Sequence, residues 1–112
     1  MGDGFAHGAS RSGVERAFRR LIRAAELPTP DFNVRLGPYE LDALWREYRV
    51  AVEIDTYRFH GGRAPFESDR VRDAGLSDLK PLRFTARRLE GKPEAVVATV
   101  ARELALGGWT GL

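Results

Sequence analysis

The sequence predicts an α/β domain in which helices flank a mixed four-stranded sheet, in the order α-β-β-β-α-β-α. Two observations lead to this prediction. Apolar residues recur at helical spacing near both ends of the chain, and alternating segments lie between residues 31 and 55. Three consecutive strands followed by a helix and a further strand imply a mixed sheet with helices on its faces. The 112 residues suffice for one domain with one core.

The composition is that of a globular protein, with 43% hydrophobic and 30% charged residues. No apolar run reaches the roughly 18 residues of a membrane span, and the first ten residues lack the apolar stretch of a secretory signal. Cysteine is absent, which excludes disulfides and cysteine-ligated zinc and fits a cytoplasmic protein. Sixteen of the eighteen basic residues are arginines. Arginine suits contacts to phosphate, although GC-rich coding DNA produces the same bias.

Residues 12–28 are expected to form the first helix, because their apolar residues recur at intervals of three and four. Ser12 and Glu15 match the S-x-x-E pattern of a capping box. Pro28 and Pro30 prevent the helix from continuing.

Three strands are expected next, at residues 31–36, 39–45 and 48–55. Gly37 and Pro38 mark the turn between the first two strands. In the second and third strands, apolar residues alternate with polar or smaller ones, which predicts one buried face.

The second half of the chain continues the alternation of helices and strands. Residues 65–76 predict a charged helix, residues 81–85 a short fourth strand, and Pro93 the start of the last helix. We therefore expect a flexible leader at residues 1–11, one domain at residues 12–106 and a frayed tail at residues 107–112.

Carboxylates are expected to gather on one face of the sheet. If residues 46–47 form a two-residue turn, Asp42 pairs with Ala51. Asp42 then shares a face with Glu53 and Asp55, because paired residues point the same way. Three carboxylates in one place repel one another unless a cation neutralises them, and oxygen ligands suit magnesium or manganese. The alternative is an exposed face on which these acids pair with arginines.

Further polar residues lie near this cluster. His60 follows the acid-bearing strand and suits a general acid or base, or else it is a structural histidine that hydrogen-bonds its own loop. Glu15 is a fourth candidate acid, unless it only completes the capping box. Helix ion pairs are the simplest explanation of Asp69, Arg72 and Asp73.

The ordered segments ER-AF--LI, LDALW, VAVEID----H, D-R-x-R-D and LRFT resemble the small Vsr-like endonuclease domains of the PD-(D/E)XK nuclease superfamily. They resemble in particular bacterial domains related to very-short-patch-repair mismatch endonucleases, some of which are fused to abortive-infection antitoxin-type winged helices. The resemblance covers residues 12–105. It implies a restriction-endonuclease-like fold and a metal-dependent DNA endonuclease or nickase, with a fused or separate DNA-reading domain as partner.

Site residues follow from this resemblance position by position. Asp42 matches the acid of the family's second core strand, and Glu53 with Asp55 matches the E-x-D of the next strand. Glu15 matches the first-helix glutamate, and His60 the histidine that follows the E-x-D strand. The implied roles are ligation of Mg²⁺ or Mn²⁺ by Asp42 and Glu53, with Asp55 either a further ligand or a residue just behind the ligands, and with Glu15 or His60 assisting water activation.

The chain also departs from the family pattern. Thr56 stands where the family has glycine, and the segment at residues 74–81 is shorter than its family counterpart. These departures keep open a non-catalytic DNA-binding or regulatory module that retains the nuclease fold; a homodimeric interaction protein is a third reading. The arginines that we expect to contact phosphates are Arg16, Arg19, Arg20, Arg63, Arg70, Arg87 and Arg88.

Overall fold

The computed structural model describes residues 11–56 and 78–111. The four strands form one mixed sheet in the order β1-β2-β3-β4, with antiparallel pairs except for the parallel pair β3 and β4. The predicted mixed α/β fold is confirmed; the helix expected at residues 65–76 lies outside the described residues. The elements in chain order are α1 (Arg11–Ala24), β1 (Asp31–Leu36), β2 (Tyr39–Trp45), the 3-10 turn η2 (Arg46–Tyr48), β3 (Val50–Asp55), β4 (Lys80–Thr85), α3 (Ala86–Gly91) and α4 (Pro93–Leu106).

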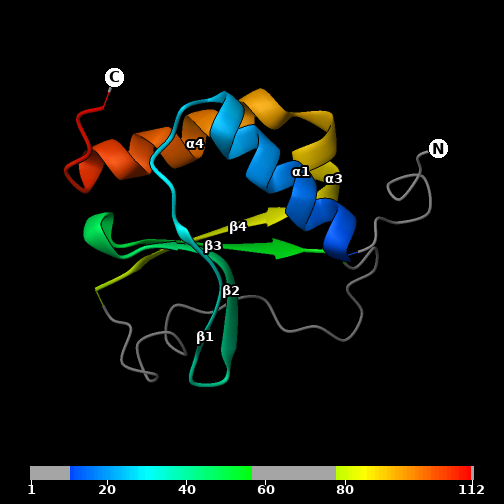
Figure 1. Ribbon diagram of the computed structural model, residues 1–112, viewed down its shortest axis with the longest axis horizontal. Helices are drawn as coiled ribbons and strands as arrows, with labels where there is room; N and C mark the ends of the chain where they lie inside the picture. The colour runs from blue at the N-terminus through cyan, green and yellow to red at the C-terminus, as the bar shows by residue number, and fades with distance from the viewer. Residues whose placement is uncertain (1–10, 57–77, 112) are drawn as a thin grey trace.

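The three described helices cover the same face of the sheet (Figure 1). Alternate residues of β2, β3 and β4 point to this face, and they bury apolar side chains against the helices. None of the helices in residues 11–56 and 78–111 is long and apolar enough to cross a bilayer. The main core includes Val14, Phe18 and Ile22 from α1, Val52, Ile54 and Phe84 from the sheet, and Val96, Val100 and Leu104 from α4.

The first helix differs from its prediction at its start. The helix already includes Arg11 and Ser12, so Ser12 is not its N-cap and the predicted capping box is wrong. At the other end, Glu26 adopts a left-handed conformation with φ 59°, and the N–H of Leu27 reaches back to the carbonyl of Ile22 at 3.1 Å. This six-to-one hydrogen bond ends the helix in a Schellman motif.

The connection between β2 and β3 is longer than a two-residue turn. Residues 46–49 form it: η2 is followed by Arg49 in the left-handed conformation, with φ 59°. Trp45 therefore pairs with Val50 rather than with Tyr48, and the predicted register is wrong by two positions. Because side chains alternate with a period of two, a shift of two leaves each residue on its predicted side of the local strand.

The hairpin of β1 and β2 reverses its facing in the middle. Phe32 pairs with Ala43, and both contact the main core, whereas Val34 pairs with Leu41, and both belong to a second cluster. The one buried face predicted for residues 39–45 is therefore wrong at Leu41. Asn33 lies at the reversal with φ 54°, a left-handed conformation that asparagine tolerates better than most residues. In Figure 1 the hairpin accordingly bends away from β3 and β4.

The end of the chain contains one helix that the sequence did not predict. The Thr85 side chain caps α3 by accepting a 3.0 Å hydrogen bond from the N–H of Arg88. The last helix begins at Pro93 as predicted. Trp109 packs against the main core, and its N–H donates to the carbonyl of Leu104 at 2.9 Å. The chain therefore packs on the core as far as Trp109, beyond the end of α4.

Two glycines provide a matched test of how α4 packs against η2. A Cβ at Gly107 would overlap the carbonyl oxygen of Tyr48, whereas a Cβ at Gly91 meets no atom within 4 Å. We expect Gly107→Ala to lower the free energy of unfolding by about 2 kcal/mol, because overpacking forces backbone shifts. Gly91→Ala should leave stability unchanged or raise it slightly. Urea denaturation of both variants measures the difference; equal effects would contradict this account of the α4–η2 contact.

Candidate functional site

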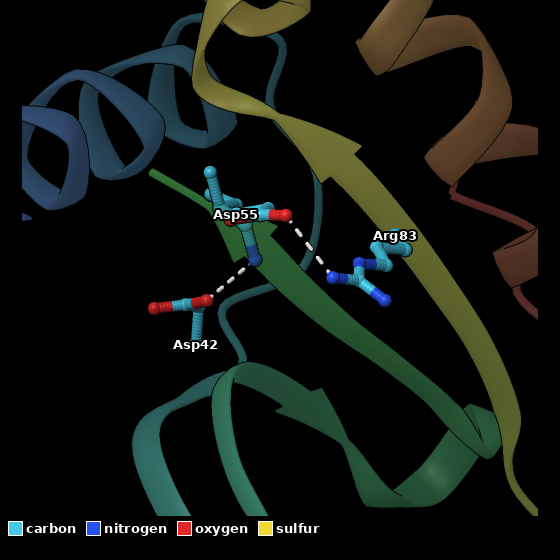
Figure 2. Close-up of polar contacts among 4 residues, drawn as sticks. Asp42, Asp55 and Arg83 are labelled. Atoms are coloured by element: carbon cyan, nitrogen blue, oxygen red, sulfur yellow. Dashed lines mark hydrogen bonds and ion pairs between the residues drawn. The ribbon is translucent and has the colours of Figure 1, made fainter. Parts of the chain in front are cut away.

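Asp42 lies where β2 separates from β3. Its side chain is buried, with 7% of the residue exposed, and no other polar or charged residue among those described is buried to this degree. Oδ2 of Asp42 accepts a 2.6 Å hydrogen bond from the N–H of Ile54 (Figure 2). A strand carbonyl would normally satisfy that N–H, so the carboxylate replaces a backbone acceptor where the strands part.

The observed register places Asp42 beside Glu53 on the neighbouring strand. The last residue pair of β2 and β3 is Ala43 with Val52, and Asp42 and Glu53 follow that pair directly. The prediction that Asp42 lies opposite Ala51 is wrong. The N–H that Asp42 accepts belongs to the peptide bond that follows Glu53, so the Asp42 carboxylate touches the backbone that carries this second acid.

Glu53 and Asp55 lie on the face of β3 that points away from the helices. The residue between them, Ile54, packs into the main core, so its neighbours face the other way. Oε1 of Glu53 is shielded from solvent. Asp55 accepts a 3.0 Å hydrogen bond from Nη2 of Arg83 on β4. The Asp55 side chain is 9% exposed and that of Arg83 is 23% exposed, so this ion pair is largely protected from water.

The predicted convergence of three carboxylates on one cation is not observed. Among residues 11–56 and 78–111, no three Asp, Glu or His side chains are grouped so that they could hold a metal ion. In Figure 2, Asp42 is directed to the N–H of Ile54, while Asp55 turns to Arg83. Magnesium often binds through one or two carboxylates, and it keeps several waters or takes substrate phosphate oxygens as further ligands. Asp42 and Glu53 supply donors that fit such a two-carboxylate site.

A small depression, with no room for a water molecule, joins Asp42 to the first helix. Asn33 bridges two α1 side chains beside it in the amide orientation that satisfies both of them: its nitrogen donates to Oε2 of Glu15 at 3.1 Å, and its oxygen accepts from Nη2 of Arg19 at 3.1 Å. Glu15 thus has a partner on β1. The residues that line the depression are Glu15, Phe18, Arg19, Phe32, Asn33, Asp42 and Ile54.

The depression also shows where Asp42 and Asp55 lie relative to the two sides of the sheet. Asp42 shares it with Phe18 and Phe32, which contact the main core under the helices. Asp55 pairs with Arg83 on the other face. Asp42 therefore lies at the boundary between the two faces, because the reversal at Asn33 turns this part of β2 toward α1.

The arginines expected to contact phosphates are only partly described. Arg19 lies over the ring of Phe32, with its guanidinium carbon 4.2 Å from the ring centre, a cation–π arrangement. Those on α1 and α3 are exposed, namely Arg16, Arg19, Arg20, Arg87 and Arg88. The site candidates that lie outside the described residues are His60, Arg63, Asp69, Arg70, Arg72 and Asp73.

Sequence reasoning missed Arg83 as a site residue. Its pairing with Asp55 links residues 28 positions apart, and the parallel register of β3 and β4 sets Arg83 opposite Glu53. The one signal in the sequence was the alternation of Leu82, Arg83 and Phe84, which places Arg83 on the polar side of its strand.

Comparison with known proteins finds no matching family model, no similar curated protein and no similar solved structure.

The hydrogen bond between Asp42 and Ile54 can be tested by stability measurements. Asp42→Ala leaves a buried N–H without this acceptor, and we expect a loss of about 2 kcal/mol in the free energy of unfolding. Asp42→Asn retains an acceptor oxygen and should lose less than half as much. Chemical denaturation with urea measures both values. Equal losses in the two variants would show that the acceptor is not what stabilises this junction.

Proposed function

We propose that this chain is a magnesium-dependent endonuclease or nickase that hydrolyses phosphodiester bonds in DNA. The observation that carries the proposal is the buried carboxylate of Asp42, at the point where β2 leaves β3 and beside Glu53. Burial of a charged group is costly, and a function is a sufficient reason to retain one here. The strand order and the resemblance to Vsr-like domains support the same assignment. The absence of cysteine is consistent with a cytoplasmic location.

In this proposal, Asp42 and Glu53 hold the metal ion, and the hydrogen bond from Ile54 fixes the orientation of the Asp42 carboxylate. A bound magnesium ion supplies Lewis-acid stabilisation of phosphoryl charge and lowers the pKa of water. Glu15 lines the same depression as Asp42 and is the acid proposed to accept a proton from the attacking water. The contact with Asn33 holds Glu15 in that position.

The exposed arginines of α1 and α3 have a different role in the proposal. Arg16 and Arg20 on α1, with Arg87 and Arg88 on α3, bind phosphates and position the DNA without reading its sequence. Recognition of a particular site then falls to a fused or separate DNA-reading domain, as the resemblance implies.

One observation favours a second candidate function. Asp42 and Asp55 both have structural partners, a backbone N–H and a guanidinium, and no group of three acids assembles among the described residues. Acids of this kind also suit a non-catalytic DNA-binding or regulatory module that keeps the nuclease fold. The two functions differ in whether the isolated protein cuts DNA, which is directly measurable.

Plasmid nicking separates the two candidates. We expect the wild type to nick supercoiled plasmid with Mg²⁺, and Asp42→Asn and Glu53→Gln each to slow nicking by roughly 100-fold or more. These substitutions keep side-chain size and an acceptor oxygen, so folding is preserved. Glu90→Gln, an exposed acid on α3, is the matched control and should nick at the wild-type rate. Binding of DNA without nicking by the wild type would favour the non-catalytic module.

Metal dependence is tested separately by chelation. EDTA should abolish nicking, and added Mg²⁺ or Mn²⁺ should restore it, since both are hard cations that accept carboxylate ligands. Gel analysis of the nicked fraction against metal concentration gives the apparent affinity. Glu53→Gln should shift that curve to higher metal concentration, whereas persistence of nicking in EDTA would rule out the metal-dependent reaction.

A further inference from the structure

Arg83 contributes a cation to the face of the sheet that carries acids. On β4 it lies between Leu82 and Phe84, which both contact the main core under the helices. Arg83 therefore points to the opposite face, the one that holds Glu53 and Asp55. In the parallel register it is the partner of Glu53, and its hydrogen bond reaches Asp55, two residues further along β3.

The contact with Asp55 holds the guanidinium in one orientation. Nη2 of Arg83 lies 3.0 Å from Oδ2 of Asp55, and both side chains are largely shielded from solvent. Charges that are shielded in this way attract more strongly than a pair on the open surface. A guanidinium has five N–H donors, and Figure 2 shows another of its nitrogens directed away from Asp55. With 23% of its side chain exposed, Arg83 remains partly accessible.

We propose that Arg83 binds a phosphate of the nucleic acid and that Asp55 is the positioning residue that orients it, rather than a metal ligand. The substrate in this inference, a nucleic acid phosphodiester, rests on the proposed function. The planar fork of arginine matches the oxygens of a phosphate. Arg83 also offsets the negative charge of Glu53 and Asp55, which would otherwise repel the nucleic acid backbone.

The two assignments of Asp55 predict effects of opposite sign. If Asp55 is a metal ligand, Asp55→Asn weakens metal binding, and it strengthens metal-free DNA binding because a negative charge is lost. If Asp55 orients Arg83, Asp55→Asn weakens metal-free DNA binding and leaves metal binding unchanged. A merely structural ion pair would alter stability without changing the salt dependence of DNA binding.

The experiment measures binding of a short fluorescein-labelled DNA duplex by anisotropy, in EDTA, over a series of salt concentrations. Arg83→Gln should weaken binding about 10-fold and reduce the salt slope by about 0.9, the value for one phosphate contact. Asp55→Asn should weaken binding about 3-fold, and it should have no effect in the Arg83→Gln background, because Asp55 acts through Arg83. The control Arg102→Gln, an exposed site on α4 on the helix side, should change binding less than about 2-fold.

Titration with Mn²⁺, followed by electron paramagnetic resonance, supplies the second readout. Asp55→Asn should bind Mn²⁺ within about 2-fold of the wild type. Unchanged or tighter DNA binding by Asp55→Asn, wild-type binding by Arg83→Gln, or loss of Mn²⁺ affinity in Asp55→Asn would each overturn the inference. Circular dichroism establishes that each variant folds. If Arg83→Gln does not fold, Arg83→Lys, which keeps the charge but lacks the fork, should weaken binding about 3-fold with an unchanged salt slope.

Binding is measured without cleavage, so the two proposals can fail independently. A wild type that binds DNA through Arg83 but does not nick it contradicts the nuclease and leaves the role of Arg83 intact. A protein that nicks DNA while Arg83→Gln binds it normally contradicts the role of Arg83 alone. A wild type with no affinity for DNA contradicts both.

Discussion

The parting of β2 from β3 at Asp42 shapes the sheet and the polar groups around it. Asn33 turns the hairpin of β1 and β2 at this point, and the main-chain pairing with β3 ends. The N–H of Ile54 is buried there, and the Asp42 carboxylate satisfies it at 2.6 Å. Beyond the junction, Val34 and the end of the hairpin pack into the second apolar cluster instead of the main core. The left-handed conformation of Asn33 thus bends the sheet, and the hydrogen bond from Ile54 satisfies the backbone at the bend. Together they determine where Asp42, the most buried acid of the sheet, lies.

The acids of the candidate site are stabilised by three different kinds of partner. Asp42 accepts from a backbone N–H, Asp55 from a guanidinium, and Glu15 from the amide of Asn33. Each partner holds its carboxylate in one orientation, and none of these partners is another acid. The acids can therefore lie near one another without converging on a single point. In the proposed function, a magnesium ion held by two of these acids takes substrate oxygens and waters as its further ligands, which is its usual coordination.

The two faces of the sheet carry different kinds of side chain. The helices cover the apolar face (Figure 1). The arginines of α1 and α3 that the proposal assigns to phosphates are exposed. The other face carries Glu53, Asp55 and Arg83. The depression that Asp42 shares with Glu15 lies between α1 and the sheet, where the helix-side surface meets the ends of β2 and β3. In the proposed function, a nucleic acid held by the α1 arginines reaches the acids at this junction, so the curvature of the hairpin has a direct bearing on access.

Local sequence patterns determined most of the elements of this fold and the strands that carry its acids. The spans of β1 and β2 match the prediction. The predicted hairpin also placed Asp42 and Glu53 on neighbouring strands, although its register was wrong by two positions. Tertiary structure alone decided which partner each carboxylate meets. The pairing of Asp55 with Arg83 joins distant positions through a parallel register, and the left-handed Asn33 turns Asp42 toward α1. Side-chain periodicity encodes neither feature. The pairing of Asp55 with Arg83 depends on how the strands associate, and the direction of Asp42 depends on the backbone dihedral of Asn33.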